Sequence, residues 1–128
     1  MRVLLDTHAL IWAVGNGPRL SRQAAEVIGD PGTTKLISVV SAYEICLKHR
    51  LGKLPEAAAL AEDFAGRIAP SEGVILDVTL DHALTAGKLD MRHRDPFDRL
   101  LIAQALVERV PLVSNEKLFD AFGVERIW

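Results

Sequence analysis

Acidic and polar side chains follow short apolar runs in this 128-residue sequence, at points where a buried strand would give way to a helix. Asp6 directly follows the first apolar run, and Ser114, Asn115 and Glu116 follow the run Pro111–Val113. A carboxylate at the carboxyl end of a strand lies where open α/β sheets bind ligands. Each of these residues could instead form a helix cap or a turn, which is an ordinary role for its type. Taken singly, each residue leaves both interpretations open.

Glu44 could have either a structural role, as part of a helix cap, or a chemical role, as an inward-facing carboxylate. The segment SAYE, residues 41–44, matches a capping box, in which the glutamate bonds the backbone at the start of a helix. Helical spacing also places Glu44 on one face with Leu47 and Leu51, so that the carboxylate begins a partly inward-facing stripe. Lys48, four residues later, could neutralise the carboxylate instead.

Asp98 falls in the first turn of a predicted helix that Asp95 would cap. Its spacing from the apolar residues of that helix predicts a side chain that points toward the sheet. A carboxylate with this orientation needs a partner. The partner could be Arg94, Arg99 or the backbone at the start of the helix, or it could be a metal ion shared with Asp6.

Acids at several strand-to-helix junctions should meet at one edge of one sheet, where their like charges raise one another's pKa. A divalent cation relieves that repulsion, and oxygen ligands without a Cys or His cluster select Mg²⁺ or Mn²⁺ over zinc. Such an ion can activate water for hydrolysis of a phosphodiester bond. We therefore predict metal-binding and catalytic roles for four acids: Asp6, Glu44, Asp98 and Glu116. The predicted supporting residues are Asp95, Ser114, Asn115 and Arg99.

An alternation of strands and helices must position these side chains. Short apolar runs predict strands at Val3–Leu5, Leu36–Val40, Val74–Leu76, Pro111–Val113 and Val124–Trp128. Helical patterns occupy Thr7–Val14, Ser21–Ile28, Ser41–Leu51, Pro55–Ile68, Thr79–Ala86, Pro96–Val110 and Lys117–Phe122. This order predicts a three-layer α/β/α fold with a central, mostly parallel sheet. The length suits a single domain, residues 1–128.

The net charge of −2 gives no overall basic field, so contacts with nucleic acid would have to come from local clusters. Two basic clusters flank the acids, although half of their members could be ordinary solvated charges: Lys48, His49, Arg50 and Lys53, then Arg92, His93, Arg94 and Arg99. Arg99, beside Asp98, is the strongest candidate among them. Aromatic residues make up 5% of the chain and do not alternate with basic ones, which argues against a base-stacking platform.

The remaining signals concern location and packing. The single cysteine, Cys46, has apolar neighbours and is predicted to be buried in a reducing compartment. No apolar run is long enough to predict a membrane helix, and Asp6 and His8 interrupt the apolar start of the chain, so we expect a soluble cytoplasmic protein. The apolar residues around the first helix could pack in the core or contact a dimer partner or antitoxin: Leu10, Ile11, Trp12 and Val14.

The sequence resembles the PIN domain family, and in particular the VapC-type toxins of bacterial toxin–antitoxin pairs. The matching segments are LLDTHALIWA at 4–13, SAYEICLKHRLGKL at 41–54, HRDPFDRLLIAQAL at 93–106, LVSNEKLF at 112–119 and GVERIW at 123–128. The resemblance implies a PIN-like fold, Mg²⁺- or Mn²⁺-dependent cleavage of RNA, a homodimer, and neutralisation by a cognate antitoxin.

The family's acidic positions fall on Asp6, Glu44 and Asp98, with Asp95 as an additional acid of this subgroup. The fourth family acid usually stands in Thr-x-Asp, whereas this chain has Ser114, Asn115 and Glu116 at that point. Glu116 keeps the charge on a longer side chain, so it ranks below the other three.

Two other functions compete with the ribonuclease interpretation. A receiver-like or phosphatase-like protein would also gather acids at strand ends, but it usually carries paired acids or Asp-x-Asp, and here Thr7 and His8 follow Asp6. A catalytically weakened PIN-like module would retain RNA or antitoxin binding after the change at Glu116.

Overall fold

The computed structural model describes residues 1–15, 18–90 and 94–128. Its strands are β1 (Arg2–Leu5), β2 (Thr34–Ser38), β3 (Val74–Leu76), β4 (Leu112–Val113) and β5 (Arg126–Ile127). The α-helices are α1 (Thr7–Val14), α2 (Arg22–Gly29), α3 (Val39–Arg50), α4 (Ala58–Glu62), α5 (Phe64–Ile68), α6 (Leu80–Lys88) and α7 (Pro96–Glu108). Three short 3₁₀ helices complete the chain: η1 (Pro55–Ala57), η2 (Ala69–Ser71) and η3 (Lys117–Phe122).

The sheet has the strand order β3-β2-β1-β4-β5, and every neighbouring pair is parallel. Leu4 of β1 is in register with Leu36 on one side and with Leu112 on the other. From β1 the chain builds outward to β2 and β3 and then returns to β4, so the order reverses between β1 and β4. Such a reversal opens a crevice at the carboxyl ends of the two strands. The order also differs from the 2-1-3-4-5 order of receiver-like folds, which argues against the receiver-like alternative.

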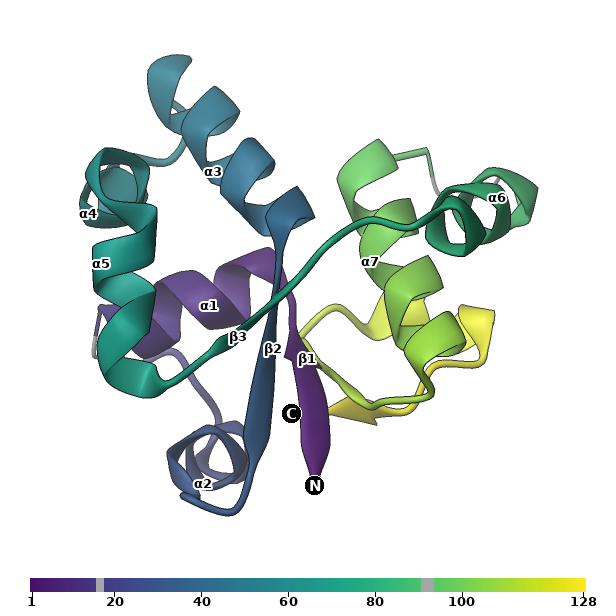
Figure 1. Ribbon diagram of the computed structural model, residues 1–128, viewed down its shortest axis with the longest axis horizontal. Helices are drawn as coiled ribbons and strands as arrows, with labels where there is room; N and C mark the ends of the chain where they lie inside the picture. The colour runs from purple at the N-terminus through teal and green to yellow at the C-terminus, as the bar shows by residue number, and fades with distance from the viewer. Residues whose placement is uncertain (16–17, 91–93) are drawn as a thin grey trace.

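Helices cover both faces of the sheet, as predicted (Figure 1). Successive residues of a strand point to opposite faces. Val3 and Leu5 accordingly belong to one buried cluster, together with residues of α1, α2, α4 and α5, whereas Leu4 belongs to a second cluster with Leu101 and Ile102 of α7. The three-layer α/β/α architecture is confirmed.

Helix α3 begins earlier than the sequence predicted. The Ser38 hydroxyl accepts a hydrogen bond from the Val40 amide at 3.0 Å and so caps the helix. The same hydroxyl donates to Oε1 of the buried Gln104 on α7 at 2.5 Å. Ser41 therefore lies inside the helix, and the predicted capping box with Glu44 is wrong.

The helix predicted over Pro55–Ile68 is broken into η1, α4 and α5. Asp63 ends α4 in an extended conformation, with φ −149° and ψ 74°, and its carboxylate accepts from the Gly66 amide to cap α5. A Cβ atom at Gly66 would lie 2.1 Å from Asp63 Oδ2. Because residue 66 is glycine, the Asp63 carboxylate can approach the backbone closely enough to cap α5. The alanine-rich segment is therefore not one continuous helix.

Two packing predictions have different outcomes. Leu10 and Ile11 are buried in the core, so the first helix uses these residues for core packing. Cys46 is exposed, and the prediction of a buried cysteine is wrong. Its neighbour Ile45 faces the core, and one residue later the helix has turned by about 100° toward solvent.

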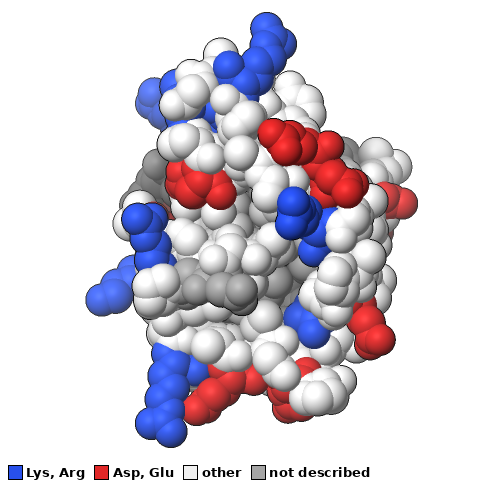
Figure 2. Space-filling model, turned by 90° about the vertical axis from the view of Figure 1, so that its left-hand side faces the viewer, with Lys and Arg blue, Asp and Glu red and all other residues white. Residues whose placement is uncertain are grey.

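Figure 2 shows the side of the molecule that lies at the left in Figure 1. Lys and Arg side chains stand mainly along its margins, with Asp and Glu among them and uncharged areas between. The described residues of this face form no continuous basic surface, in keeping with the net charge of −2. Along the described ranges, every helix is too short or too polar to cross a membrane.

Candidate active site

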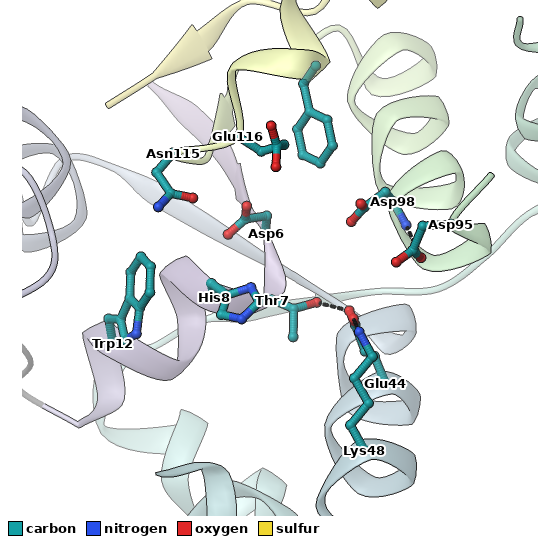
Figure 3. A pocket seen from close by; sticks show the side chains of 11 residues that line it. Asp6, Thr7, His8, Trp12, Glu44, Lys48, Asp95, Asp98, Asn115 and Glu116 are labelled. Carbon is teal, nitrogen blue, oxygen red and sulfur yellow. Dashed lines mark hydrogen bonds and ion pairs between the residues drawn. The ribbon is translucent and has the colours of Figure 1, made fainter. Parts of the chain in front are cut away.

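A pocket of about 280 Å³ opens where β1 and β4 end (Figure 3). It brings together segments from four parts of the chain: the start of α1, the middle of α3, the start of α7 and the turn after β4. Its lining residues are Asp6, Thr7, His8, Trp12, Glu44, Lys48, Asp95, Asp98, Asn115, Glu116 and Phe119. All four acids that the sequence singled out are among them.

Asp6 lies at the base of the pocket and also caps α1. Its Oδ1 atom accepts a hydrogen bond from the Ala9 amide at 2.7 Å, and the side chain is buried. Burial raises the pKa of Asp6 to about 6. Hydrogen bonds from the Ser114 hydroxyl and the Ala9 amide and the charge of His8 oppose this rise, whereas the charge of Asp98 adds to it. Asp6 therefore caps α1 and lines the pocket at the same time, and its carboxylate lacks a full countercharge.

Glu44 is buried on the inward side of α3, and both of its oxygens have partners. The Thr7 hydroxyl donates to Oε1 at 2.6 Å, and Lys48 forms an ion pair with Oε2. The Ser41 hydroxyl lies 3.1 Å from that of Thr7. Neutralisation of Glu44 by Lys48 is thus confirmed. Sequence reasoning missed Thr7, although its place next to Asp6 at the end of a strand was the available signal.

The Lys48 ammonium group supplies positive charge inside the pocket. Burial lowers its pKa, but the hydrogen bond and charge of Glu44, with the charges of Asp95 and Asp98, raise it overall. The ammonium also lies 5.5 Å from the centre of the Phe97 ring. Lys48 therefore stays protonated and partly balances the surrounding carboxylates.

Asp95 and Asp98 come from the start of α7. Asp95 Oδ1 accepts from the amides of Phe97 at 2.9 Å and of Asp98 at 3.3 Å, which confirms the predicted helix cap. The Asp98 side chain is half-buried and points into the pocket (Figure 3). One acid thus fixes the helix end that carries the other.

The turn after β4 contributes the remaining polar residues. The buried Ser114 hydroxyl bonds Asp6 and accepts from the Glu116 amide at 3.0 Å. Glu116 Oε1 accepts from the Leu118 amide at 3.1 Å and so caps η3. Asn115 is exposed and lines the pocket. Ser114 orients Asp6 from below the pocket surface.

Arg99 does not line the pocket, and the prediction that it contacts substrate phosphate is wrong. Its guanidinium is buried and donates to the carbonyl oxygens of Ala86 and Leu89, each at 2.7 Å, and of Asp90 at 2.9 Å. One residue along the helix turns the side chain by about 100°, so Arg99 faces α6 while Asp98 faces the pocket. Arg99 donates to carbonyl groups at the end of α6, where the helical hydrogen-bond pattern stops; among them, Ala86 also accepts from the Leu89 amide at 3.4 Å.

Of the described members of the two basic clusters, Lys48 alone lines the pocket. Arg92 and His93 lie outside the described residues. Apart from Arg99, the other described members of the two basic clusters lie on the surface outside the pocket. They are His49, Arg50, Lys53 and Arg94.

Replacing Arg99 by Met is expected to lower the free energy of unfolding by about 3 kcal/mol, because buried carbonyl groups lose charge-assisted hydrogen bonds. Urea denaturation measures this change. Lys88→Met removes an exposed charge from the same end of α6 and serves as the control. An Arg99→Met midpoint equal to that of the control would contradict the capping role.

The donor set of the pocket suits a hard divalent cation in kind, since its members are carboxylate oxygens and Asp6 lacks a countercharge. Among the described residues, however, no three Asp, Glu, His or Cys side chains already stand close enough together to chelate an ion. The reason is visible in their partners: Glu44 is paired with Lys48, while Asp95 and Glu116 cap helices. Binding of a cation would require some of these carboxylates to reorient.

The sequence model of the PIN domain family matches residues 3–125. No curated protein matches the chain.

Solved structures of similar fold include VapBC2 from Rickettsia felis bound to a promoter DNA fragment. It is 18% identical with a TM-score of 0.69, and 100% of each chain is covered. A toxin–antitoxin complex from Klebsiella pneumoniae is 21% identical with a TM-score of 0.62, covering 89% of this chain and 86% of that one. VapC20 from Mycobacterium tuberculosis, described as a toxin that cleaves the sarcin–ricin loop, is 18% identical with a TM-score of 0.65 and 95% coverage of both chains. At these identities the likeness concerns the fold.

Proposed function

Since the chain belongs to the PIN domain family, we propose that it is a metal-dependent endoribonuclease toxin that a cognate antitoxin neutralises. The observation that carries the proposal is the meeting of Asp6, Glu44, Asp98 and Glu116 in one pocket, although they come from four distant segments. Helix caps alone would have no reason to converge in this way. The similarity of the fold to VapBC2 and VapC20 supports the toxin class.

In this proposal Asp6 and Asp98 hold the ion, and Glu44 and Glu116 complete its environment. A bound Mg²⁺ or Mn²⁺ would activate water and offset the charge that develops on the phosphate. Ser114 keeps the Asp6 carboxylate aimed at the pocket, and Asp95 keeps the start of α7 in place. Lys48 balances Glu44 when no ion is bound and, once released, faces the substrate phosphate.

The proposal includes RNA as substrate, a homodimer, an antitoxin partner and a cytoplasmic location. Four exposed apolar side chains on β3 and α6 support a protein partner, because a surface of this kind is commonly covered. They are Val74, Ile75, Leu80 and Leu84, which are 48%, 48%, 74% and 50% exposed.

The direct test is incubation of the purified protein with structured RNA in the presence of Mg²⁺, Mn²⁺ or EDTA. We expect cleavage products with either ion and none with EDTA. Cleavage that is equally fast in EDTA would refute the metal-dependent mechanism.

A catalytically weakened binding module remains the second candidate, because Glu116 replaces the usual aspartate and one of its oxygens caps η3. Comparing Glu116→Asp with the natural chain separates the two candidates, because a weakened module predicts cleavage by the variant alone. We expect this variant to cleave RNA at least as fast as the natural chain, since the shorter carboxylate restores the usual family residue. Complete loss of cleavage on this change would show instead that the longer side chain is required.

A further inference from the structure

One wall of the pocket carries no carboxylate. Trp12 and His8 of α1 and Asn115 after β4 form this side, which we call the aromatic wall (Figure 3). Asp95, Asp98 and the Glu44–Lys48 pair lie on the opposite side, with Asp6 and Glu116 between the two. The pocket therefore offers two environments, one suited to a phosphate with its cation and one suited to an uncharged planar group.

The Trp12 ring is held in place by other rings and by a cation. Its centre lies 5.5 Å from that of His8 and 5.7 Å from that of Trp128, the residue after β5, and the Arg19 guanidinium lies 6.0 Å from it. Tilted ring pairs at such separations are attractive, as is a cation near an indole face. A ring fixed in this manner loses little conformational freedom when a ligand stacks on it.

Stability alone does not account for an indole at position 12. The Trp12 Nε1 atom is buried and has no hydrogen-bond partner within the described chain. A buried donor without an acceptor costs stability, and a phenyl ring would fill much of the same space without that cost. The contacts of the ring with His8, Trp128 and Arg19 stabilise the indole but leave this donor unused.

Asn115 adds polar recognition to the aromatic wall. It is exposed, and its amide makes no hydrogen bond with any residue in the described ranges. A carboxamide offers both donors and an acceptor, which is what the edge of a nucleobase requires.

We propose that the aromatic wall binds one unpaired nucleobase of the RNA, stacked on Trp12 and bonded through its edge to Asn115, beside the phosphate that is cleaved. This inference rests on the proposed ribonuclease function and narrows its substrate to RNA with an exposed base at the cut site. A base inside a duplex has neighbours on both faces, so it must leave the helix or belong to a loop or an end to stack on a protein ring.

The sequence led us to expect no base-stacking platform, and this proposal replaces that expectation. That expectation looked for aromatic and basic residues alternating along one segment. The wall is instead assembled by the fold, since Trp12 and its supporting Trp128 stand at opposite ends of the 128-residue chain.

The first test measures stacking without cleavage. The chain has two tryptophans, so Trp128→Phe leaves Trp12 as the single indole emitter, and Asp98→Asn in addition prevents cutting. We expect octaadenylate RNA to quench the Trp12 fluorescence in Mg²⁺ buffer, whereas a ribose-phosphate strand of the same length without bases leaves it unchanged. Equal quenching by both strands, or by neither, would overturn the stacking proposal.

The second test uses cleavage of an RNA in which single nucleotides are made abasic in turn. For the natural chain, we expect an abasic nucleotide at one position next to the cut to slow cleavage roughly tenfold, the scale of base–aromatic stacking. Trp12→Leu should cut the intact RNA at this lower rate and lose its sensitivity to the abasic position. Trp12→Phe, which keeps a stacking face, should retain most of the rate. Tyr43→Leu serves as the control, because Tyr43 is an exposed aromatic residue of α3 that does not line the pocket.

The outcomes separate this inference from the function on which it rests. If the natural chain cleaves RNA but no abasic position matters, or if Trp12→Leu slows intact and abasic RNA equally, the base subsite is wrong and the nuclease stands. If no RNA is cleaved at all, the nuclease proposal fails, and the fluorescence test still decides whether the wall binds a base.

Discussion

Replacement of Asp6 or Asp98 by Asn is expected to abolish RNA cleavage while the fold stays intact. Asparagine has nearly the same shape as aspartate and still accepts a hydrogen bond, so the cap of α1 at Ala9 is retained after the change at position 6. The negative charge that would hold the cation is lost. Because a bound metal contributes several kcal/mol to transition-state stabilisation, the rate should fall by roughly a thousandfold or more.

Initial rates of RNA cleavage in Mg²⁺ and Mn²⁺ measure this effect, and circular dichroism checks the fold. Asp81→Asn is the matched control, because Asp81 is an exposed acid in the first turn of α6, outside the pocket. Retained cleavage in both the Asp6 and the Asp98 variant would reject the assignment of the site.

Without a cation, Asp6→Asn is expected to stabilise the fold at neutral pH. Burial holds the pKa of Asp6 at about 6 in the folded chain, above its ordinary value of 3.8. This difference corresponds to a cost of about 3 kcal/mol once the carboxylate is ionised. Below pH about 4 the group is protonated in both states and the cost is absent; as pH rises through about 6, stability is lost.

Urea denaturation in EDTA across this pH range tests the sign. The free energy of unfolding of Asp6→Asn minus that of the natural chain should increase between pH about 4 and about 6 and then level off. Mn²⁺ should stabilise the natural chain more above pH about 6 than below it, because the ion supplies the countercharge that ionised Asp6 lacks. The same ion should stabilise Asp6→Asn far less. A difference that does not change with pH would contradict the raised pKa.

The architecture of the chain could be read from its sequence because the relevant signals are local. Apolar runs and helical spacing identified all five strands and the order of the main helices, and strands alternating with helices required parallel pairing. Helix boundaries depended on capping contacts that the pattern does not reveal. The start of α3 is set by Ser38, and the break before α5 is set by Asp63 and its close approach to Gly66.

The meeting of the four acids in one pocket could be predicted from the sequence, as could the pairing of Glu44 with Lys48, but the bond from Thr7 to Glu44 could not. Asp6 and Glu116 stand at strand ends, so the reversal of strand order between β1 and β4 brings them to one crevice. The side on which a helical residue faces is decided by tertiary packing. For that reason Arg99 was expected to contact substrate phosphate, whereas it caps α6. Trp12 was expected to pack in the core or to contact a partner, and it also lines the pocket.

The hydrogen bonds from Arg99 to the end of α6 couple motion of α6 to the start of α7. Helix α6 buries His82 and Ala86 and packs chiefly against α7, where His82 Nε2 lies 3.1 Å from Glu108 Oε2. Local opening of one such helix requires less free energy than global unfolding. Each opening event would detach the carbonyl groups of Ala86 and Leu89 from Arg99 and free the first turn of α7 that carries Asp98. The lifetime of the assembled pocket would then be set by a helix that contributes no side chain to it.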